Sequence, residues 1–168
     1  MKYLIASDAH GRSDLLYSAA KLHRDREGLI YLGDGIKDID EQQLTDGNKA
    51  FLCVKGNCDL CVSAVYPYPE ELLICISEYT VIMVHGHLHG VKSGIEKMLV
   101  YADKRGANVV LFGHTHVPFE AYFPSGTRID GHTLSRDIWM FNPGSISSRS
   151  YGLMQIKDGQ ILFSHGKA

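Results

Sequence analysis

The sequence lacks the features that mark membrane proteins and dedicated nucleic-acid-binding proteins. Its apolar runs all fall well short of the roughly 18 residues that a membrane-spanning helix needs. Lysine and arginine number 17 against 19 acidic residues, and they form no basic stripe. The apolar run near the start covers about four residues, whereas the core of a signal peptide covers about 7–15. We therefore expect a cytoplasmic protein with no membrane partner and no stable nucleic-acid partner.

Internal repeats, linkers and low-complexity tracts are also absent. The 168 residues include 45% hydrophobic and 21% charged residues, which is near the average for globular proteins. A chain of this length typically builds one core. We therefore expect a single domain over residues 1–168.

Cysteine is too sparse for a disulfide framework, with only four residues in the chain. Cys58 and Cys61 form one C-x-x-C pair, but a structural zinc site needs about four ligands and no second pair exists. The residues after Cys61 open a helix poorly, which disfavours a thioredoxin-like redox pair. The apolar runs do not end in cysteine, which argues against a soft thiolate metal site.

The hydrophobic pattern alternates strands and helices through the first two thirds of the chain and then becomes all strand. Helices are predicted at 12–27 with Ser13 as N-cap, over part of 36–44, and at 91–106 with Gly106 as C-cap. Strands are predicted at 2–7, at 28–34, in 49–59 where a strand runs into a turn, in a hairpin of two strands over 71–90, and at 107–116, 119–123, 138–145, 151–157 and 160–166. This order predicts an α/β sandwich that contains two sheets.

Polar side chains follow the apolar strands at the point where each strand ends. The crevice of an open α/β sheet lies outside the carboxyl ends of its strands, so these side chains are expected to converge. Carboxylate, imidazole and amide ligands together suit divalent cations such as Mn²⁺, Fe²⁺ or Zn²⁺. Seven ligands exceed the need of one ion with an open position and fit two ions that share a carboxylate. The seven are Asp8, His10, Asp34, Asn57, His85, His114 and His116.

The ordered motifs that contain these residues resemble those of the calcineurin-like metallophosphoesterases. They are "DAH" at 8–10, "GD" at 33–34, "GNCD" at 56–59, "HGH" at 85–87 and "GHTH" at 113–116, followed by "NPGS" at 142–145. The chain is most similar to the small single-domain phosphodiesterase branch of bacteria and archaea. The resemblance implies two mixed β-sheets packed face to face with helices outside, in a four-layer αββα arrangement.

The resemblance also implies a role for each ligand. Asp8, His10 and His116 would bind one metal, and Asn57, His85 and His114 the other, with Asp34 bridging them. A water or hydroxide between the two cations would attack phosphorus. Mn²⁺ is the cation we expect, with Fe, Zn and Ni as alternatives. Asn57, Cys58, Asp59 and His85 are the residues predicted to take part in catalysis.

Cys58 departs from the most common form of the family pattern. Many members have histidine at this position, which is taken to protonate or stabilise the leaving oxygen. A thiol is a weaker donor, with a pKa near ~8.5, so substrates with good leaving groups would suffer least. In the phosphodiesterase branch a cysteine is familiar here. Asp59 is expected to orient a partner or a water, and Asn142 to brace the loop beneath the metals.

Other candidate residues are predicted to play smaller parts. His87 and His89 share the loop of His85, where a substrate-facing or supporting role stays open. His23, His132 and His165 are predicted to be solvated surface residues. The apolar segment at 65–69, together with the strand-rich last third, is a candidate surface for a homo-oligomer.

The function expected from these observations is hydrolysis of small phosphodiesters at a dinuclear metal centre. A phosphomonoesterase or protein phosphatase is the first alternative, which Cys58 and the short chain disfavour. A non-catalytic interaction scaffold is the second, as is thought for the retromer subunit that shares this fold. That subunit has lost part of the histidine set, whereas all seven positions are filled here, which favours catalysis.

Overall fold

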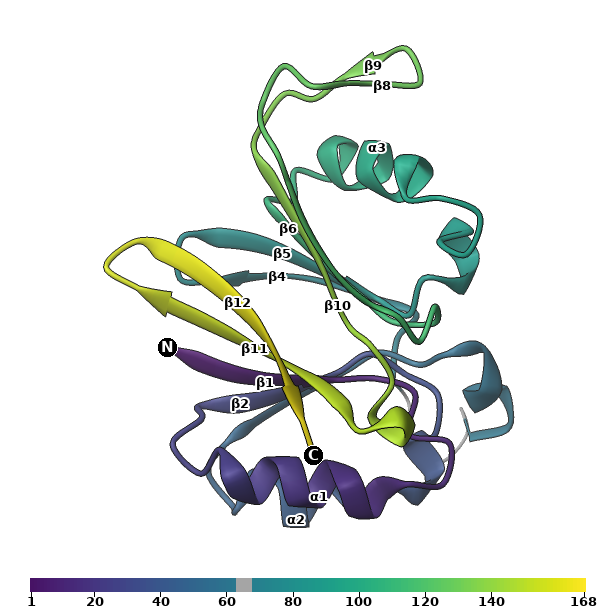
Figure 1. Cartoon of the computed structure of the whole chain (residues 1–168), viewed down its shortest axis with the longest axis vertical. Coiled ribbons are helices and arrows are strands. Elements are labelled where there is room, and N and C mark those ends of the chain that lie inside the picture. Colours follow the sequence, from purple (N-terminus) through teal and green to yellow (C-terminus); the bar gives the residue numbers. More distant parts are fainter. Residues whose placement is uncertain (63–67) are drawn as a thin grey trace.

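The computed structural model arranges the chain in four layers, with helices on both outer sides of two stacked β-sheets (Figure 1). It describes residues 1–62 and 68–168. Residues 65–67 of the proposed oligomer surface lie outside the described part. Within the described residues, no helix is long and apolar enough to cross a bilayer. The predicted four-layer αββα fold is confirmed.

The first sheet has five strands in the order β12-β11-β1-β2-β3. Its strands β1, β2 and β3 run parallel, while β11 and β12 form an antiparallel hairpin against β1. Two helices, α1 and α2, cover its outer face (Figure 1). The elements of this half are β1 (Lys2–Ala6), α1 (Ser13–Leu22), β2 (Gly28–Tyr31), α2 (Glu41–Thr45), β3 (Ala50–Cys53), β11 (Ser150–Lys157) and β12 (Gln160–Lys167).

The second sheet also has five strands, in the order β4-β5-β6-β10-β7. Here β5, β6 and β10 run parallel, and the edge strands β4 and β7 are antiparallel to their neighbours. A two-stranded arm, β8 with β9, projects beyond α3 (Figure 1). The elements are β4 (Glu71–Ile76), β5 (Tyr79–Val84), α3 (Glu96–Lys104), β6 (Val109–Phe112), β7 (Pro118–Phe123), β8 (Arg128–Ile129), β9 (His132–Thr133) and β10 (Ile138–Pro143).

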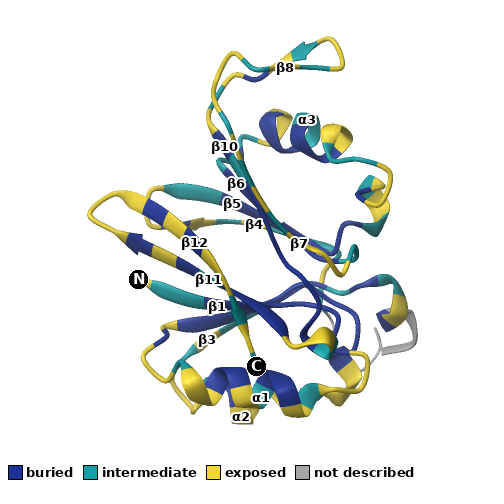
Figure 2. Cartoon of the chain, viewed as in Figure 1, coloured by how far each residue is buried: buried dark blue, intermediate teal, exposed yellow. Residues whose placement is uncertain are grey.

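Alternation along the central strands explains why four layers form. Successive side chains of a strand point to opposite faces. In β1, Leu4 packs under the helices and Ile5 packs between the two sheets. In β6, Leu111 packs between the sheets and Val110 packs under α3. Both faces of these strands are therefore buried (Figure 2), which is why they read as continuous apolar runs rather than as alternating ones.

The helix boundaries differ from the prediction at four points. The helix predicted over 91–106 begins at Glu96, because Gly94 has a φ of +147° that no helix interior adopts. Its C-cap is Arg105, so the prediction of Gly106 was wrong by one position, and Gly106 follows with a φ of +80°. The first helix ends at Leu22 instead of reaching residue 27. Its N-cap is Arg12, without a capping side-chain hydrogen bond, so the prediction of Ser13 was wrong.

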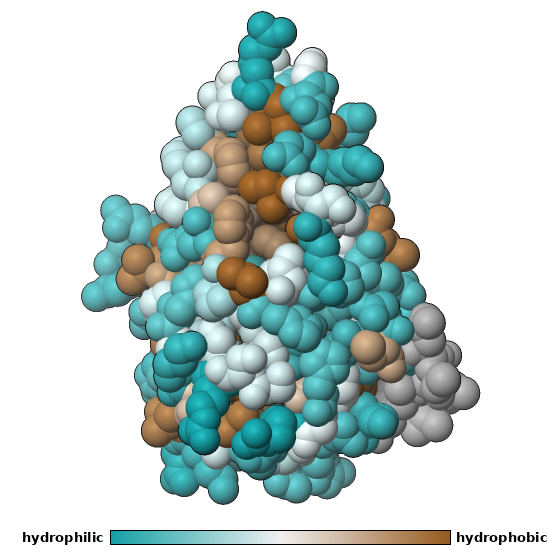
Figure 3. Space-filling view, turned by 45° about the vertical axis from the view of Figure 1, so that its right-hand side comes forward, coloured by the Kyte–Doolittle hydropathy of each residue, from teal (hydrophilic) through white to brown (hydrophobic). Residues whose placement is uncertain are grey.

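The hydropathy of the exposed surface changes along the long axis of the molecule. On the face shown in Figure 3, the more hydrophobic residues gather in the upper half, which is the side of α3 and the arm, while the lower half is largely hydrophilic. The lower half is the side on which α1 and α2 lie.

Candidate metal centre

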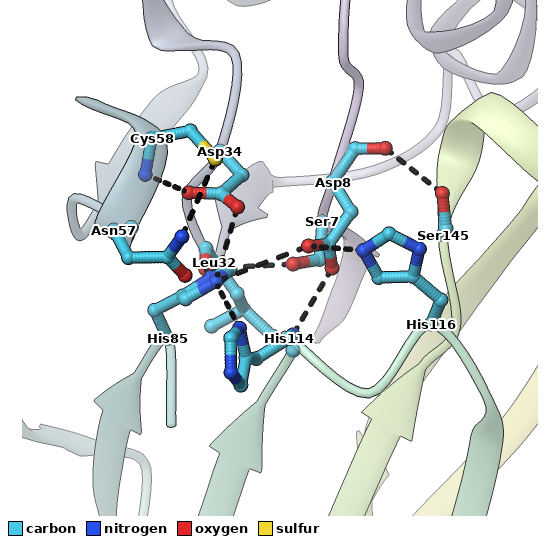
Figure 4. Close-up of polar contacts among 12 residues, drawn as sticks. Ser7, Asp8, Leu32, Asp34, Asn57, Cys58, His85, His114, His116 and Ser145 are labelled. Carbon is cyan, nitrogen blue, oxygen red and sulfur yellow. Dashed lines mark hydrogen bonds and ion pairs between the residues drawn. The ribbon is translucent and has the colours of Figure 1, made fainter. Parts of the chain in front are cut away.

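The predicted ligands meet at one edge of the sandwich, beyond the carboxyl ends of five parallel strands. Asp8 and His10 follow β1, Asp34 follows β2, and Asn57 follows β3. His85 follows β5 directly, and the loop with His114 and His116 follows β6. The first three strands belong to one sheet and the last two to the other, so the centre lies where the two sheets present their ends together (Figure 4).

Left-handed backbone turns aim most of these side chains at the centre. Five of the seven ligands have a positive φ: Asp8 at 58°, His10 at 44°, Asp34 at 63°, His114 at 67° and His116 at 61°. An L-residue in this region is strained by about 1 kcal/mol or more, and such residues cluster at functional sites. The repeated strain at strand ends indicates that side-chain placement, and not chain stability, determines these turns.

Three ligands form one group at the more exposed side of the centre. His116 Nε2 lies 3.2 Å from Asp8 Oδ1, and His10 Nε2 lies 3.8 Å from the same oxygen. The two histidine Nε2 atoms are 3.3 Å apart. One carboxylate oxygen and two imidazole nitrogens thus face a common point, which is a donor set suited to a divalent cation.

A second group lies deeper. His85 Nε2 is 3.4 Å from Asp34 Oδ2 and 3.1 Å from His114 Nδ1. The other carboxylate oxygen of Asp34 accepts a hydrogen bond from the Cys58 backbone N–H at 2.8 Å. Asp34 Oδ2 is also 4.0 Å from His10 Nε2, so this oxygen is within reach of both groups.

Two buried oxygen atoms of the centre lack hydrogen-bond donors, which bears on whether cations fit between the predicted ligands. Asp8 Oδ1 and Asn57 Oδ1 are buried, and neither accepts a hydrogen bond from any residue that the structure describes. A buried acceptor without a partner costs about 1–3 kcal/mol. Cations held by these oxygens and by the facing imidazole nitrogens would remove that cost. The residues present therefore fit a pair of divalent cations.

Asp59 braces the loops from below. Its Oδ2 accepts the backbone N–H groups of Asp34 at 2.7 Å and Gly56 at 2.8 Å. Its Oδ1 accepts those of Gly35 at 2.9 Å and Ile36 at 3.0 Å. With four donors on one buried carboxylate, Asp59 positions the two loops and has no oxygen left to face the histidines.

Other buried groups hold the remaining ligands. His85 Nδ1 lies 2.7 Å from the Leu32 carbonyl, which turns Nε2 toward the centre. Asn142 donates to the Gly113 carbonyl at 2.9 Å and to Thr115 Oγ1 at 3.1 Å, so it braces the "GHTH" loop as predicted. The Ser145 hydroxyl donates to the Asp8 carbonyl at 2.9 Å.

Two supporting residues were missed by the sequence reasoning. The Tyr31 hydroxyl donates to the Asp34 carbonyl at 2.7 Å and accepts from the Ala9 N–H at 3.0 Å, which ties the first two ligand loops together. Ser145 lies in "NPGS", and its motif was the only signal that pointed to it. Tyr31 looks like one more core residue of an apolar strand, so the sequence pattern around it did not indicate a supporting role in the centre.

Burial and neighbouring charges shift the pKa values of the centre. Burial alone would raise the pKa of Asp34, but His85 and the Cys58 N–H lower it below its ordinary value. Burial lowers the pKa of His114 to about 4, aided by His85, so its ring is neutral and able to bind a cation. Burial and Asp34 raise the pKa of the Cys58 thiol to about 11. The thiol is therefore protonated at neutral pH.

The other two histidines of the "HGHLH" segment lie near the ligands in different ways. His87 has its ring 6.1 Å from that of His114, and its Nε2 is 3.8 Å from Glu70 Oε2. His89 instead packs its ring against Tyr101, with 4.8 Å between ring centroids. Of the two, His87 is the one placed beside the centre.

The prediction that three further histidines are solvated surface residues holds for His165, which is exposed, but not for His23 and His132, which are half-buried. His23 Nε2 lies 2.9 Å from the Tyr151 hydroxyl, and His132 Nε2 lies 2.8 Å from Asp103 Oδ2. His165 Nε2 lies 2.8 Å from the Asn142 carbonyl, with its ring stacked on Phe141. Their partners are distant in sequence, so no local pattern could have revealed these contacts.

Two five-stranded mixed sheets that present this aspartate, histidine and asparagine set at their shared edge define a metallophosphoesterase. The chain belongs to the calcineurin-like phosphoesterase superfamily, whose domain model matches residues 1–166. The probable metallophosphoesterase YsnB of Bacillus subtilis (strain 168) is 30% identical over 165 residues, which cover 94% of this chain and 86% of that protein.

Solved structures agree with this assignment. A predicted phosphoesterase from Streptococcus pneumoniae TIGR4 superposes with a TM-score of 0.73 at 25% identity, over 99% of this chain and 88% of that chain. Wild-type Vps29 from Entamoeba histolytica, complexed with Zn²⁺, superposes with a TM-score of 0.64 at 17% identity, over 99% of both chains. At that identity Vps29 shows the shared fold alone.

Proposed function

We propose that the chain hydrolyses small phosphodiesters with two divalent cations, for which Mn²⁺ is the expected metal. The observation that carries this proposal is the convergence of seven ligand side chains from five strand ends, with Asp34 within reach of both groups. Bound there, the cations would lower the pKa of a water and neutralise charge on the phosphate oxygens.

We assign the ligands by the groups that the geometry forms. Asp8, His10 and His116 would hold one cation. His85, His114 and Asn57 would hold the other, Asn57 through its unpartnered buried Oδ1. Asp34 would touch both, and its lowered pKa keeps it ionised for that purpose. This division agrees with the one that the family resemblance implies.

The remaining catalytic assignments describe what protein groups do around the phosphate. Asn57 Nδ2 lies 3.3 Å from Cys58 Sγ, so the two side chains are adjacent at the rim of the centre. Asp59 acts as a positioning residue through its four backbone hydrogen bonds. His85, fixed by the Leu32 carbonyl, keeps its free nitrogen toward the cations.

Cys58 supports diesters over monoesters as substrates. At neutral pH a thiol carries no positive charge, whether or not it is protonated. A phosphate monoester near neutral pH carries close to two negative charges, whereas a diester carries one. A histidine at this position would add positive charge for a monoester, and the thiol does not. A weak donor also favours esters whose leaving group departs without strong protonation.

The test compares two chromogenic esters on protein stripped of metal and then reloaded with Mn²⁺. Bis-p-nitrophenyl phosphate should be cleaved faster than p-nitrophenyl phosphate, and Asp34→Asn should abolish both activities. Asp158→Asn is the control, because Asp158 is exposed in the turn between β11 and β12, away from the predicted ligands.

Preference for the monoester would contradict the role given to Cys58. Failure to cleave either ester with any divalent cation, while metal still binds, would contradict catalysis and favour the scaffold. The two outcomes are distinguishable, because monoester preference still gives cleavage, whereas the scaffold gives metal binding without cleavage.

A further inference from the structure

A basic pocket lies between α1 and α2, on the outer helical layer of the first sheet. It has a volume of about 320 Å³ and is lined by Tyr17, Ala20, Lys21, Arg24, Arg26, Gln43 and Asp46. Its α1 residues are Tyr17, Ala20 and Lys21, whereas His10 precedes the start of that helix. The predicted metal ligands do not line this pocket, so it is separate from the metal centre.

Arg26 forms the buried part of this pocket. Its side chain is in a residue only 3% exposed, and its Nη1 donates to the Ala20 and His23 carbonyls at 2.6 and 3.0 Å. Its Nη2 donates to the carbonyl of Leu44, and its buried Nε has no acceptor among the described residues. Its hydrogen bonds thus go to neutral carbonyls, and Asp46 is the carboxylate whose charge acts on it. Burial of a charge is costly unless an opposite charge accompanies it.

The other charges of the pocket leave a positive excess. Lys21 and Arg24 are exposed, and within residues 1–62 and 68–168 neither makes an ion pair. Asp46 is the carboxylate of the pocket, and its Oδ2 is already held by Lys49 Nζ at 3.0 Å. Three cations therefore face one engaged carboxylate, in a chain whose net charge is −2.

A structural role for Arg26, which joins the ends of α1 and α2, accounts for only part of this cluster of cations. The three hydrogen bonds of Arg26 do join the end of α1 to the end of α2, and this bracing needs neither Lys21 nor Arg24. The open volume beside Arg26 corresponds to about ten waters at ~30 Å³ each, which is enough for a small organic phosphate. Lysine and arginine together are the side chains that proteins use to bind phosphate.

We propose that this pocket binds a small phosphate monoester, whose phosphate would lie against Arg26 and be held by Lys21 and Arg24. The ligand is expected to be a free metabolite, because a pocket of about 320 Å³ holds a small molecule. The hydroxyl of Tyr17 accepts the Asp40 N–H at 2.7 Å, which fixes its ring as a wall of the pocket.

The test is an NMR titration of ¹⁵N-labelled, Mg²⁺-loaded protein with glycerol 3-phosphate at constant ionic strength. Saturable shifts are expected at residues 20–26 and 43–46, independent of any shifts at residues 114–116 that report binding at the metal centre. The double variant Lys21→Gln/Arg24→Gln should weaken binding reported by the first set about tenfold or more, because both exposed cations that would hold the phosphate are lost.

Two further variants sharpen the result. Asp46→Asn should tighten binding, because it removes the negative charge of the pocket. Lys97→Gln/Lys104→Gln removes two charges from the exposed face of α3 and should leave binding unchanged. Equal weakening by both double variants, shifts that never saturate, or binding only to phosphatidic acid vesicles would each overturn the proposal. Arg26 is left intact, so loss of folding does not confuse the outcome.

Discussion

Replacing Asp59 with asparagine removes a carboxylate that holds two ligand loops together. The wild-type side chain accepts four backbone N–H groups, two on each oxygen. Asparagine keeps one oxygen for two of them and turns an NH₂ group toward the other two. Two hydrogen bonds to a charged acceptor are lost, at about 1.5–3 kcal/mol each, for a total of about 3–6 kcal/mol. The site is only 2% exposed, so solvent does not replace them.

This loss is large beside the total stability of about 5–15 kcal/mol that is typical of a native domain. Urea unfolding followed by circular dichroism should show it directly, and the melting temperature should fall by about 6–24 °C for a chain of this size. Mn²⁺ affinity, measured by calorimetry, should fall about tenfold or more, as it does when outer partners of metal ligands are removed.

The control is Asp158→Asn, whose exposed side chain lies in the turn between β11 and β12. It should leave both stability and affinity close to wild type. A destabilisation by Asp59→Asn below about 1 kcal/mol, the value of one ordinary hydrogen bond, would refute the bracing role derived from the structure.

Three other predictions follow from the same structure. Leu16→Ala, at a fully buried position under the first sheet, should cost about 2–5 kcal/mol, whereas Leu22→Ala, at a position 65% exposed, should change the free energy of unfolding by less than about 0.5 kcal/mol. Burial alone would raise the pKa of Asp103, but hydrogen bonds from His132 and Ser135 lower it. The ionised Asp103 carboxylate therefore stabilises the fold at pH values above the unfolded pKa of ~3.9, and this stabilisation is lost as pH falls through the folded pKa. Wild type and Asp103→Asn should differ in melting temperature near neutral pH and converge in acid. Cys58→His, which supplies a stronger donor and positive charge, should raise the ratio of p-nitrophenyl phosphate to bis-p-nitrophenyl phosphate cleavage, and Cys58→Ser should leave that ratio unchanged.

The sequence predicted which side chains gather at the shared edge of the sheets, because each of them is local to a strand end. Asp8, Asp34 and His85 all stand within three residues of a buried apolar run, and the carboxyl ends of parallel strands meet in space. The layered fold was predictable for a related reason. Strands buried on both faces, such as β6, need a helix on one side and a second sheet on the other.

What the sequence could not predict depends on contacts between distant segments. The His23 ring meets Tyr151 across 128 positions, and His132 meets Asp103 across 29. The arm strands β8 and β9 have two residues each, which is too short for any periodicity to appear. Tyr31 follows the apolar pattern of its strand while its hydroxyl ties two ligand loops.

The same limit applies to the basic pocket. Lys21 and Arg24 look like ordinary solvated residues at the end of a helix. They become candidate phosphate-binding residues only beside Arg26. Arg26 is buried where α2 packs near it and the Leu44 carbonyl accepts its hydrogen bond.

The most direct measurement of the central claim is anomalous X-ray diffraction from crystals of the Mn²⁺-loaded protein. If the centre is dinuclear, two manganese peaks are expected about 3.5–4 Å apart, with the Asp34 carboxylate between them and three of the other predicted ligands around each. Asp34→Asn crystals should show both peaks weakened. A single peak, or manganese bound away from Asp34, would contradict the dinuclear centre.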